Sequence, residues 1–224
     1  EAIMLARETG NRYFLAANVC NLGAIRLRRG EWQLARELLD EGNRLCRDAG
    51  LSSVASIAEA NLGAALLGLG SIAAARRHLG QVAERARHLG LVSLELNCER
   101  DLARAAIAEG QGGEARARLQ RMLALARPDA LASDQLRALA VYAELLTSEG
   151  ADALAADAWR HALDQPQLDA TSRAEAIRRL AALDQAGASP GSGARATTLD
   201  DWVARMLAET VAAVPGNAGE TPGR

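Results

Sequence analysis

Residues 20–36 read CNLGAIRLRRGEWQLAR, and forty positions later residues 60–76 read ANLGAALLGLGSIAAAR. The tetrapeptide Asn-Leu-Gly-Ala stands at 21–24 and again at 61–64. The same step continues outward through Gly30, Gly70, Gly110 and Gly150, through Ala35, Ala75, Ala115 and Ala155, through Gly10, Gly50 and Gly90, and through Leu22, Leu62, Leu102 and Tyr142. Several markers in one register predict a repeat architecture in which each unit packs on its neighbours.

The glycines of the repeat have structural reasons. Glycine inside a helix costs ~1 kcal/mol relative to alanine, so its recurrence at Gly23 and Gly63 indicates a close crossing of two helices. The small residues Ala103 and Ala143 occupy the same place in later repeats. The glycines in register with Gly30 follow a first helix, where a left-handed residue ends it. Those in register with Gly10 are expected to end the second helix of each pair.

Between these stops, apolar residues recur at helical spacing. The predicted helix pairs are 12–29 with 32–49, 52–69 with 71–89, 91–109 with 113–127, and 131–149 with 152–164. We therefore predict an all-α fold, a right-handed α-solenoid of antiparallel helix pairs over residues 1–184. Its parts are an orphan helix at 1–9, repeats at about 11–50, 51–90, 91–130 and 131–168, and a capping helix at about 170–184.

The C-terminal segment has a different pattern. Residues 185–197 are mostly Ala, Gly, Ser and Pro and predict a flexible linker. Thr198 is an expected N-cap, with Asp200 and Asp201 suited to the helix dipole. An amphipathic helix is predicted at 198–214 and a disordered tail at 215–224. The helix either docks near Ile177 and Leu180, lies in the groove of its own solenoid, or binds a partner.

Composition limits the function classes. The chain has 224 residues, of which 49% are hydrophobic and only 3% aromatic, which favours many closely packed helices. All basic residues are arginine, as is typical of a GC-rich bacterial genome. The net charge of −2 gives no overall basic field for nucleic acid, so no direct nucleic-acid binding is expected.

The three cysteines, Cys20, Cys46 and Cys98, fit neither a close-paired metal motif nor a disulfide framework. We interpret them as small buried helical residues in a protein of the reducing cytoplasm. The sequence shows no signal peptide and no apolar run long enough for a membrane span. Because the chain begins at Glu1 within a helical pattern, it is expected to be part of a larger protein.

At these residues the sequence resembles the tetratricopeptide repeat family. The family pattern is matched by Leu22-Gly23, Gly30, Trp32 and Ala35, then by Leu62-Gly63, Gly70, Ile72 and Ala75, and more weakly later, where Gly112 and Asp152 replace the aromatic residue. The usual period is ~34 residues, so forty indicates a longer-helix variant. HEAT and armadillo repeats have similar lengths but lack this spacing.

Residues 159–183 are also similar to the ends of helical arrays in large bacterial regulators, which couple such arrays to an ATPase, a kinase or a DNA-binding domain. The resemblance rests on His161, Pro166, Asp169, Arg173, Ala176 and Leu180. It implies a non-catalytic protein-interaction or effector-sensing module. The alternatives are a stand-alone peptide-binding scaffold or chaperone adaptor, and an accessory helical domain of an enzyme.

No motif for catalysis or cofactor binding is present in the sequence. The glycines stand at helix ends or crossings at fixed spacing, there is no Gly-rich loop leading to lysine, and neither His-Glu-x-x-His nor Cys-x-x-Cys occurs. His78, His88 and His161 are isolated and are interpreted as ordinary polar residues. We therefore expect no catalytic residue, no metal ligand and no cofactor.

Solenoids bind partners on the concave face formed by the first helices. The family resemblance implies that the following residues face this groove: Ala17, Cys20, Asn21, Ala24, Leu27, Ile57, Ala60, Asn61, Ala64, Leu67, Asn97, Arg100, Arg104, Ile107, Arg137, Ala140, Glu144 and Thr147. Of these, the predicted partner-binding residues are Asn21, Leu27, Asn61, Leu67, Asn97, Arg100, Arg104 and Arg137. The expected partner is a protein or peptide.

The two halves of this groove differ in their expected ligand chemistry. In related arrays an asparagine at the place of Asn21 and Asn61 holds an extended peptide, but either could instead bond only the adjacent helical turn. Arg100, Arg104 and Arg137 could together bind a carboxylate or phosphate. Alternatively, these arginines are solvated or paired with Glu99, Asp101 and Glu144.

Overall fold

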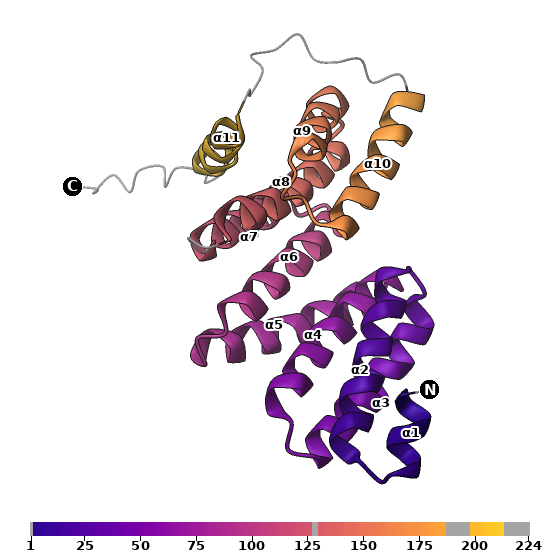
Figure 1. Cartoon of the computed structure of the whole chain (residues 1–224). Helices are drawn as coiled ribbons and strands as arrows, with labels where there is room; N and C mark the ends of the chain where they lie inside the picture. The colour runs from indigo at the N-terminus through magenta and orange to yellow at the C-terminus, as the bar shows by residue number, and fades with distance from the viewer. Residues whose placement is uncertain (1, 127–129, 187–197, 213–224) are drawn as a thin grey trace, which may run out of the picture.

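The computed structural model describes residues 2–126, 130–186 and 198–212, and this part of the chain consists of eleven α-helices with no strand (Figure 1). The first helices of the pairs are α2 (Arg12–Arg28), α4 (Ser52–Gly68), α6 (Val92–Ala108) and α8 (Leu131–Ser148). The second helices are α3 (Trp32–Asp48), α5 (Ile72–His88), α7 (Gly112–Leu125) and α9 (Asp152–Asp164). The remaining helices are α1 (Ala2–Glu8), α10 (Ala170–Gln185) and α11 (Leu199–Ala212). The predicted all-α solenoid-like array is confirmed.

Each helix from α1 to α10 packs on the next one along the chain, so the repeats form a continuous stack (Figure 1). Successive first helices, from α2 to α8, also contact one another, and successive second helices have no contact of comparable extent. This difference places the first helices on the inner side of the array. Helix α10 packs on α9 and touches α8, and so takes the place of a further first helix.

The turns between helices confirm the predicted role of the glycines. Gly30, Gly70, Gly110 and Gly150 have φ values of 74°, 73°, 69° and 75°, a left-handed conformation that favours glycine. After α2, the Gly30 N–H donates to the Leu27 carbonyl at 3.0 Å and the Glu31 N–H donates to the Arg26 carbonyl at 3.1 Å. This bond pattern satisfies carbonyls at the helix end and turns the chain sharply.

The glycines inside the first helices lie at close helix crossings, as predicted. A Cβ atom on Gly63 would stand 2.6 Å from Cγ of Leu79, and one on Gly23 would stand 2.7 Å from Cγ of Leu39. Both distances are shorter than carbon atoms tolerate, so the pairs α2–α3 and α4–α5 pack closely because these residues lack a side chain.

All three cysteines are buried and none forms a disulfide, as the sequence interpretation required. Cys20 of α2 and Cys46 of α3 are neighbours, with their Sγ atoms 3.6 Å apart. At the N-terminal end, Met4 and Leu5 of α1 are 65% and 60% exposed, so the apolar side of this helix is only partly covered.

The C-terminal helix packs on its own array, but not near Ile177 and Leu180, which was one of the three positions that the sequence left open. It packs on α7 and α8, and Ile177 of α10 remains 57% exposed. The predicted docking position near Ile177 and Leu180 is therefore wrong. The predicted linker at 185–197 and tail at 215–224 lie almost entirely outside the described residues.

Candidate functional site: the inner face of the first helices

The inner face of α2, α4, α6 and α8 carries the predicted partner-binding residues. Asn21 is exposed, and Leu27, Asn61, Leu67, Asn97, Arg100, Arg104 and Arg137 are half-buried. Cys20 was expected in the groove as well, but it is 6% exposed and its Sγ is directed at Cys46. Cys20 therefore lies on the side of α2 that packs against α3. Gly42 of α3 has no side chain and so leaves room there for the sulfur of Cys20.

In the first half of this face, two side-chain amides occupy the same place in consecutive repeats. The side chains of Asn21 and Asn61 form no hydrogen bond within the described part of the chain. By contrast, Nδ2 of Asn18, elsewhere on α2, donates to the Phe14 carbonyl at 2.7 Å. The alternative that Asn21 and Asn61 bond the adjacent turn is therefore not what the structure shows.

Leu27 and Leu67, also forty residues apart, are less available. Both are packed against buried clusters of the core, Leu27 on the cluster around Cys20 and Leu39, and Leu67 on the cluster around Leu79. Only part of each side chain faces solvent. They can supply an apolar edge to a bound segment, but they also contribute to the core.

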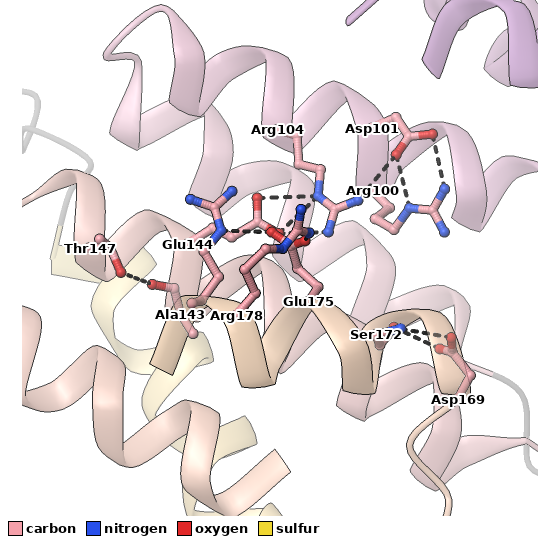
Figure 2. Close-up of polar contacts among 11 residues, drawn as sticks. Arg100, Asp101, Arg104, Ala143, Glu144, Thr147, Asp169, Ser172, Glu175 and Arg178 are labelled. Atoms are coloured by element: carbon pink, nitrogen blue, oxygen red, sulfur yellow. Dashed lines mark hydrogen bonds and ion pairs between the residues drawn. The ribbon is translucent and has the colours of Figure 1, made fainter. Parts of the chain in front are cut away.

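In the second half, arginines on the inner face are paired with carboxylates of the same chain (Figure 2). Arg100 donates through Nε and Nη2 to the two carboxylate oxygens of Asp101, at 2.9 and 3.0 Å, and through Nη1 to Oδ1 of Asn97 at 3.4 Å. Arg104 donates through Nε and Nη2 to Glu144 at 3.0 and 2.6 Å. The second pair joins α6 to α8.

Arg137 lies among carboxylates too. Its Nη1 is 3.4 Å from Oδ1 of Asp134, which is 3% exposed, and its Nε is 4.0 Å from Oδ2 of Asp169. The three arginines that sequence analysis grouped as one anion site are thus each beside their own carboxylate. The anion site stays a prediction, and an incoming anion would compete with Asp101, Glu144 and Asp134.

Electrostatics favours these internal pairs. Burial lowers the pKa of Arg104, but Glu144 and Asp101 raise it by more, so the pKa lies above its usual value. The guanidinium therefore stays charged and held by two acids at any physiological pH. Figure 2 shows that Glu175 and Arg178 of α10 extend this alternating pattern toward the end of the array.

A second constellation, which sequence analysis missed, lies on the opposite side of the first helices. Glu59 of α4 contacts Arg47 of α3 and Arg85 of α5. Forty residues later, Glu99 of α6 is 0% exposed, with Arg118 of α7 at 3.0 Å, Arg87 of α5 at 3.6 Å and Arg121 of α7 at 3.5 Å. The shared spacing of forty was a signal that could have revealed it.

These buried glutamates act as links between second helices. Burial raises the pKa of Glu59, but hydrogen bonds and charge from Arg47 and Arg85 lower it by more, so the pKa lies below its usual value. The carboxylate is therefore charged at neutral pH and holds α3 and α5 to α4. Arginines of the second helices surround both carboxylates.

Among the residues that the structure describes, no three His, Cys, Asp or Glu side chains converge to hold a metal ion. In that same part of the chain, no helix combines the length and apolar character that crossing a bilayer requires.

Comparison with known proteins adds no assignment. No protein-family model matches the sequence, and no curated protein shows significant similarity to it. What the chain binds has to be argued from the geometry of the inner face.

Proposed function

We propose that this chain is a non-catalytic binding module, and that it holds an extended segment of a protein partner along the inner face of α2, α4 and α6. The observation that carries the proposal is the pair of accessible, unbonded amides of Asn21 and Asn61 on neighbouring first helices.

An asparagine amide suits this task because it has one acceptor and two donors, the same kinds of group as a peptide backbone. Ala17 and Ala24 flank Asn21 one helical turn away, and Ala64 follows Asn61. These small side chains leave the amides accessible to a main chain lying across the helices. An extended peptide could thus bond both amides, with side-chain contacts at Leu27 and Leu67.

The proposal also concerns the kind of protein in which this module occurs. The forty-residue period and the Leu-Gly, Gly and Ala spacing support a tetratricopeptide-like array, and such arrays serve as sensing or interaction parts of bacterial regulators that carry an ATPase, a kinase or a DNA-binding domain. A stand-alone scaffold or adaptor is the second candidate. It is favoured if the same peptide-binding face operates without any attached domain.

The test is selection of 12-residue peptides from a displayed library, followed by affinity measurement on purified protein. Each amide that bonds a peptide contributes about 0.5–1.5 kcal/mol, so Asn21→Ala combined with Asn61→Ala should weaken selected peptides roughly 10- to 100-fold. Asn18→Ala is the matched control, since it removes an amide from α2 that already bonds the Phe14 carbonyl. Selected peptides whose affinity is the same for the double variant would refute the proposed face.

A further inference from the structure

Helix α11 binds the outer side of the array through two anchors one turn apart. Trp202 and Met206 are 1% and 2% exposed. The Trp202 ring lies edge-on to Tyr142 of α8, with ring centroids 6.4 Å apart, and is 6.4 Å from the ring of His161 of α9. Nε2 of Gln120 in α7 reaches the Leu207 carbonyl at 3.5 Å. We call this surface of α7, α8 and α9 the α11 seat.

The repeat register explains why a helix binds here. The place held by Glu59 in α4 and Glu99 in α6 is held by Leu139 in α8, which is 0% exposed. Those glutamates are covered by arginines of the flanking second helices, whereas Leu139 needs apolar cover. Likewise Leu154 of α9 replaces Glu114 of α7. The array becomes apolar on its outer side where α11 docks.

An ion pair of the repeat is also completed by α11. In the middle of the array Arg76 binds Glu109 at 2.6 Å and Glu114 at 2.7 Å. One repeat later Arg116 binds Glu149 at 2.5 Å, and its second carboxylate is Glu209 of α11 at 3.8 Å. The α11 seat thus recognises a defined helix, with an aromatic anchor, a methionine one turn on and an acid three residues later.

Helix α11 has its own N-terminal cap, and its binding to the α11 seat is expected to be of modest strength. The Thr198 hydroxyl accepts from the Asp201 N–H at 3.1 Å, and the Asp201 carboxylate accepts from the Thr198 N–H at 2.9 Å, so the helix carries its own cap. Its hold is limited because Nε1 of Trp202 is buried with no hydrogen-bond partner, and Leu207 stays 42% exposed. The sequence joining it to α10 is eleven residues, GASPGSGARAT.

We propose that the α11 seat binds α11 of a second copy, so that two chains associate by reciprocal exchange of this helix. The second copy is the partner that carries the required Trp202, Met206 and Glu209 in the right order. Exchange keeps every contact of the closed chain, and the balance between closed monomer and exchanged dimer is set by the tether alone. From its length and its small residues, the joining sequence is expected to give an effective concentration in the millimolar range, so closed monomers should prevail in dilute solution.

The first test removes the tether, by deleting residues 187–197 so that Ala186 joins Thr198. Figure 1 shows α10 and α11 on opposite sides of α9, and we expect that a direct join keeps α11 from its own seat. The expected result is a dimer whose dissociation constant is at least about 100-fold below that of the intact chain. Trp202 emission, read with Trp32→Phe and Trp159→Phe, should remain blue-shifted. Adding Trp202→Ala and Met206→Ala should return the chain to monomer.

A second test uses chains of natural length, in case the deletion impairs folding. One variant, Arg116→Glu, weakens the seat but keeps α11, and the other, Trp202→Ala with Met206→Ala, keeps the seat but weakens α11. Mixed together, they should form a 1:1 complex that neither forms alone, and Glu209→Arg added to the first variant should restore its closed monomer.

Two outcomes overturn the proposal. One is a tether-deleted chain that stays monomeric, whether Trp202 is exposed or buried. The other is a dimer that is unaffected by Trp202→Ala and Met206→Ala, because association would then use another surface.

Discussion

The central repeats and the C-terminal end share one period but are held together differently. On the outer side of α4 and α6, the buried Glu59 and Glu99 join flanking second helices through arginines. In α8 the same place is Leu139, which belongs to one buried apolar cluster with Trp202 and Met206 of α11. A repeat period therefore specifies where helices lie, while single departures from it specify where something else can bind.

The inner side shows the same contrast between halves. Asn21 and Asn61 are unbonded, whereas Arg100, Arg104 and Arg137 are each engaged by acids of the chain. The unbonded amides of the inner face therefore lie in its N-terminal half, and the internal ion pairs of its arginines in its C-terminal half. The α11 seat lies on the other side of that C-terminal half.

The largest expected effect is a loss of stability from a substitution at a helix crossing of the central region. Gly63→Leu forces a side chain onto Leu79, where even a Cβ would be 2.6 Å from Cγ. Overpacking of this kind should lower the free energy of unfolding by roughly 2–3 kcal/mol. The measurement is denaturant unfolding followed by circular dichroism. Gly80→Ala is the control, since a Cβ there meets nothing within 4 Å.

If Gly63→Leu unfolds at the same denaturant concentration as Gly80→Ala, the close crossing is not what packs α4 on α5. A substitution at the corresponding position of α8 extends the comparison to the C-terminal end. Ala143 holds the same register place and already carries a Cβ at 0% exposure. The α8–α9 crossing is therefore wider and should lose less stability when this position is enlarged by one methyl group.

The fold could be read from the sequence because its determinants are local and periodic. Left-handed glycines such as Gly30 and Gly70, and crossing glycines such as Gly63, recur at one spacing and have one physical use each. Helix ends followed directly from these glycines. The register was less reliable for the accessible positions of the first helices, because Cys20, Ala60 and Ala140 were expected in the groove but are buried.

The ion pairs could not be read in the same way. An arginine reaches several carboxylates, and sequence alone does not choose between a ligand and Asp101 for Arg100, or between solvent and Glu144 for Arg104. The position of α11 was left open among three alternatives, none of which was the surface of α7 and α8, for a related reason. An amphipathic helix on a tether can cover any apolar surface, and the decisive clue, Leu139 in place of a buried glutamate, has meaning only once Glu59 and Glu99 are seen to be buried.

The next effect in size tests the buried glutamates by pH. Because the pKa of Glu59 is lowered in the folded state, its contribution is fully present above the unfolded value of about 4.5 and is lost as pH falls through the folded value. Glu59→Gln should cost about 1–2 kcal/mol at pH 7, since its arginine partners are largely solvated. The cost should shrink as the pH falls below about 4.5 toward the lowered pKa of the folded state.

Thermal unfolding of both proteins between pH 3 and pH 7 measures this convergence. Glu37→Gln, on the exposed surface of α3, serves as the control for loss of one negative charge. A difference between Glu59→Gln and the unaltered chain that stays constant across the pH range would contradict the linking role of Glu59.

The smallest effect concerns Tyr142 in the α11 seat. Burial, with the neighbouring Glu209 carboxylate, raises the pKa of Tyr142 well above its usual value near 10. The neutral hydroxyl is favoured in the folded state, so its contribution to stability is full below the unfolded pKa and declines as pH rises above about 10.

Because α11 forms one wall of this site, its release should let Tyr142 ionise closer to its usual value. In a Tyr13→Phe background, absorbance at alkaline pH reports Tyr142 alone, and Trp202→Ala with Met206→Ala should lower the midpoint of its ionisation toward the usual value near 10. An unchanged midpoint would mean that α8 and its neighbours, not α11, keep water from the hydroxyl, and that the apolar character of this end does not depend on the docked helix.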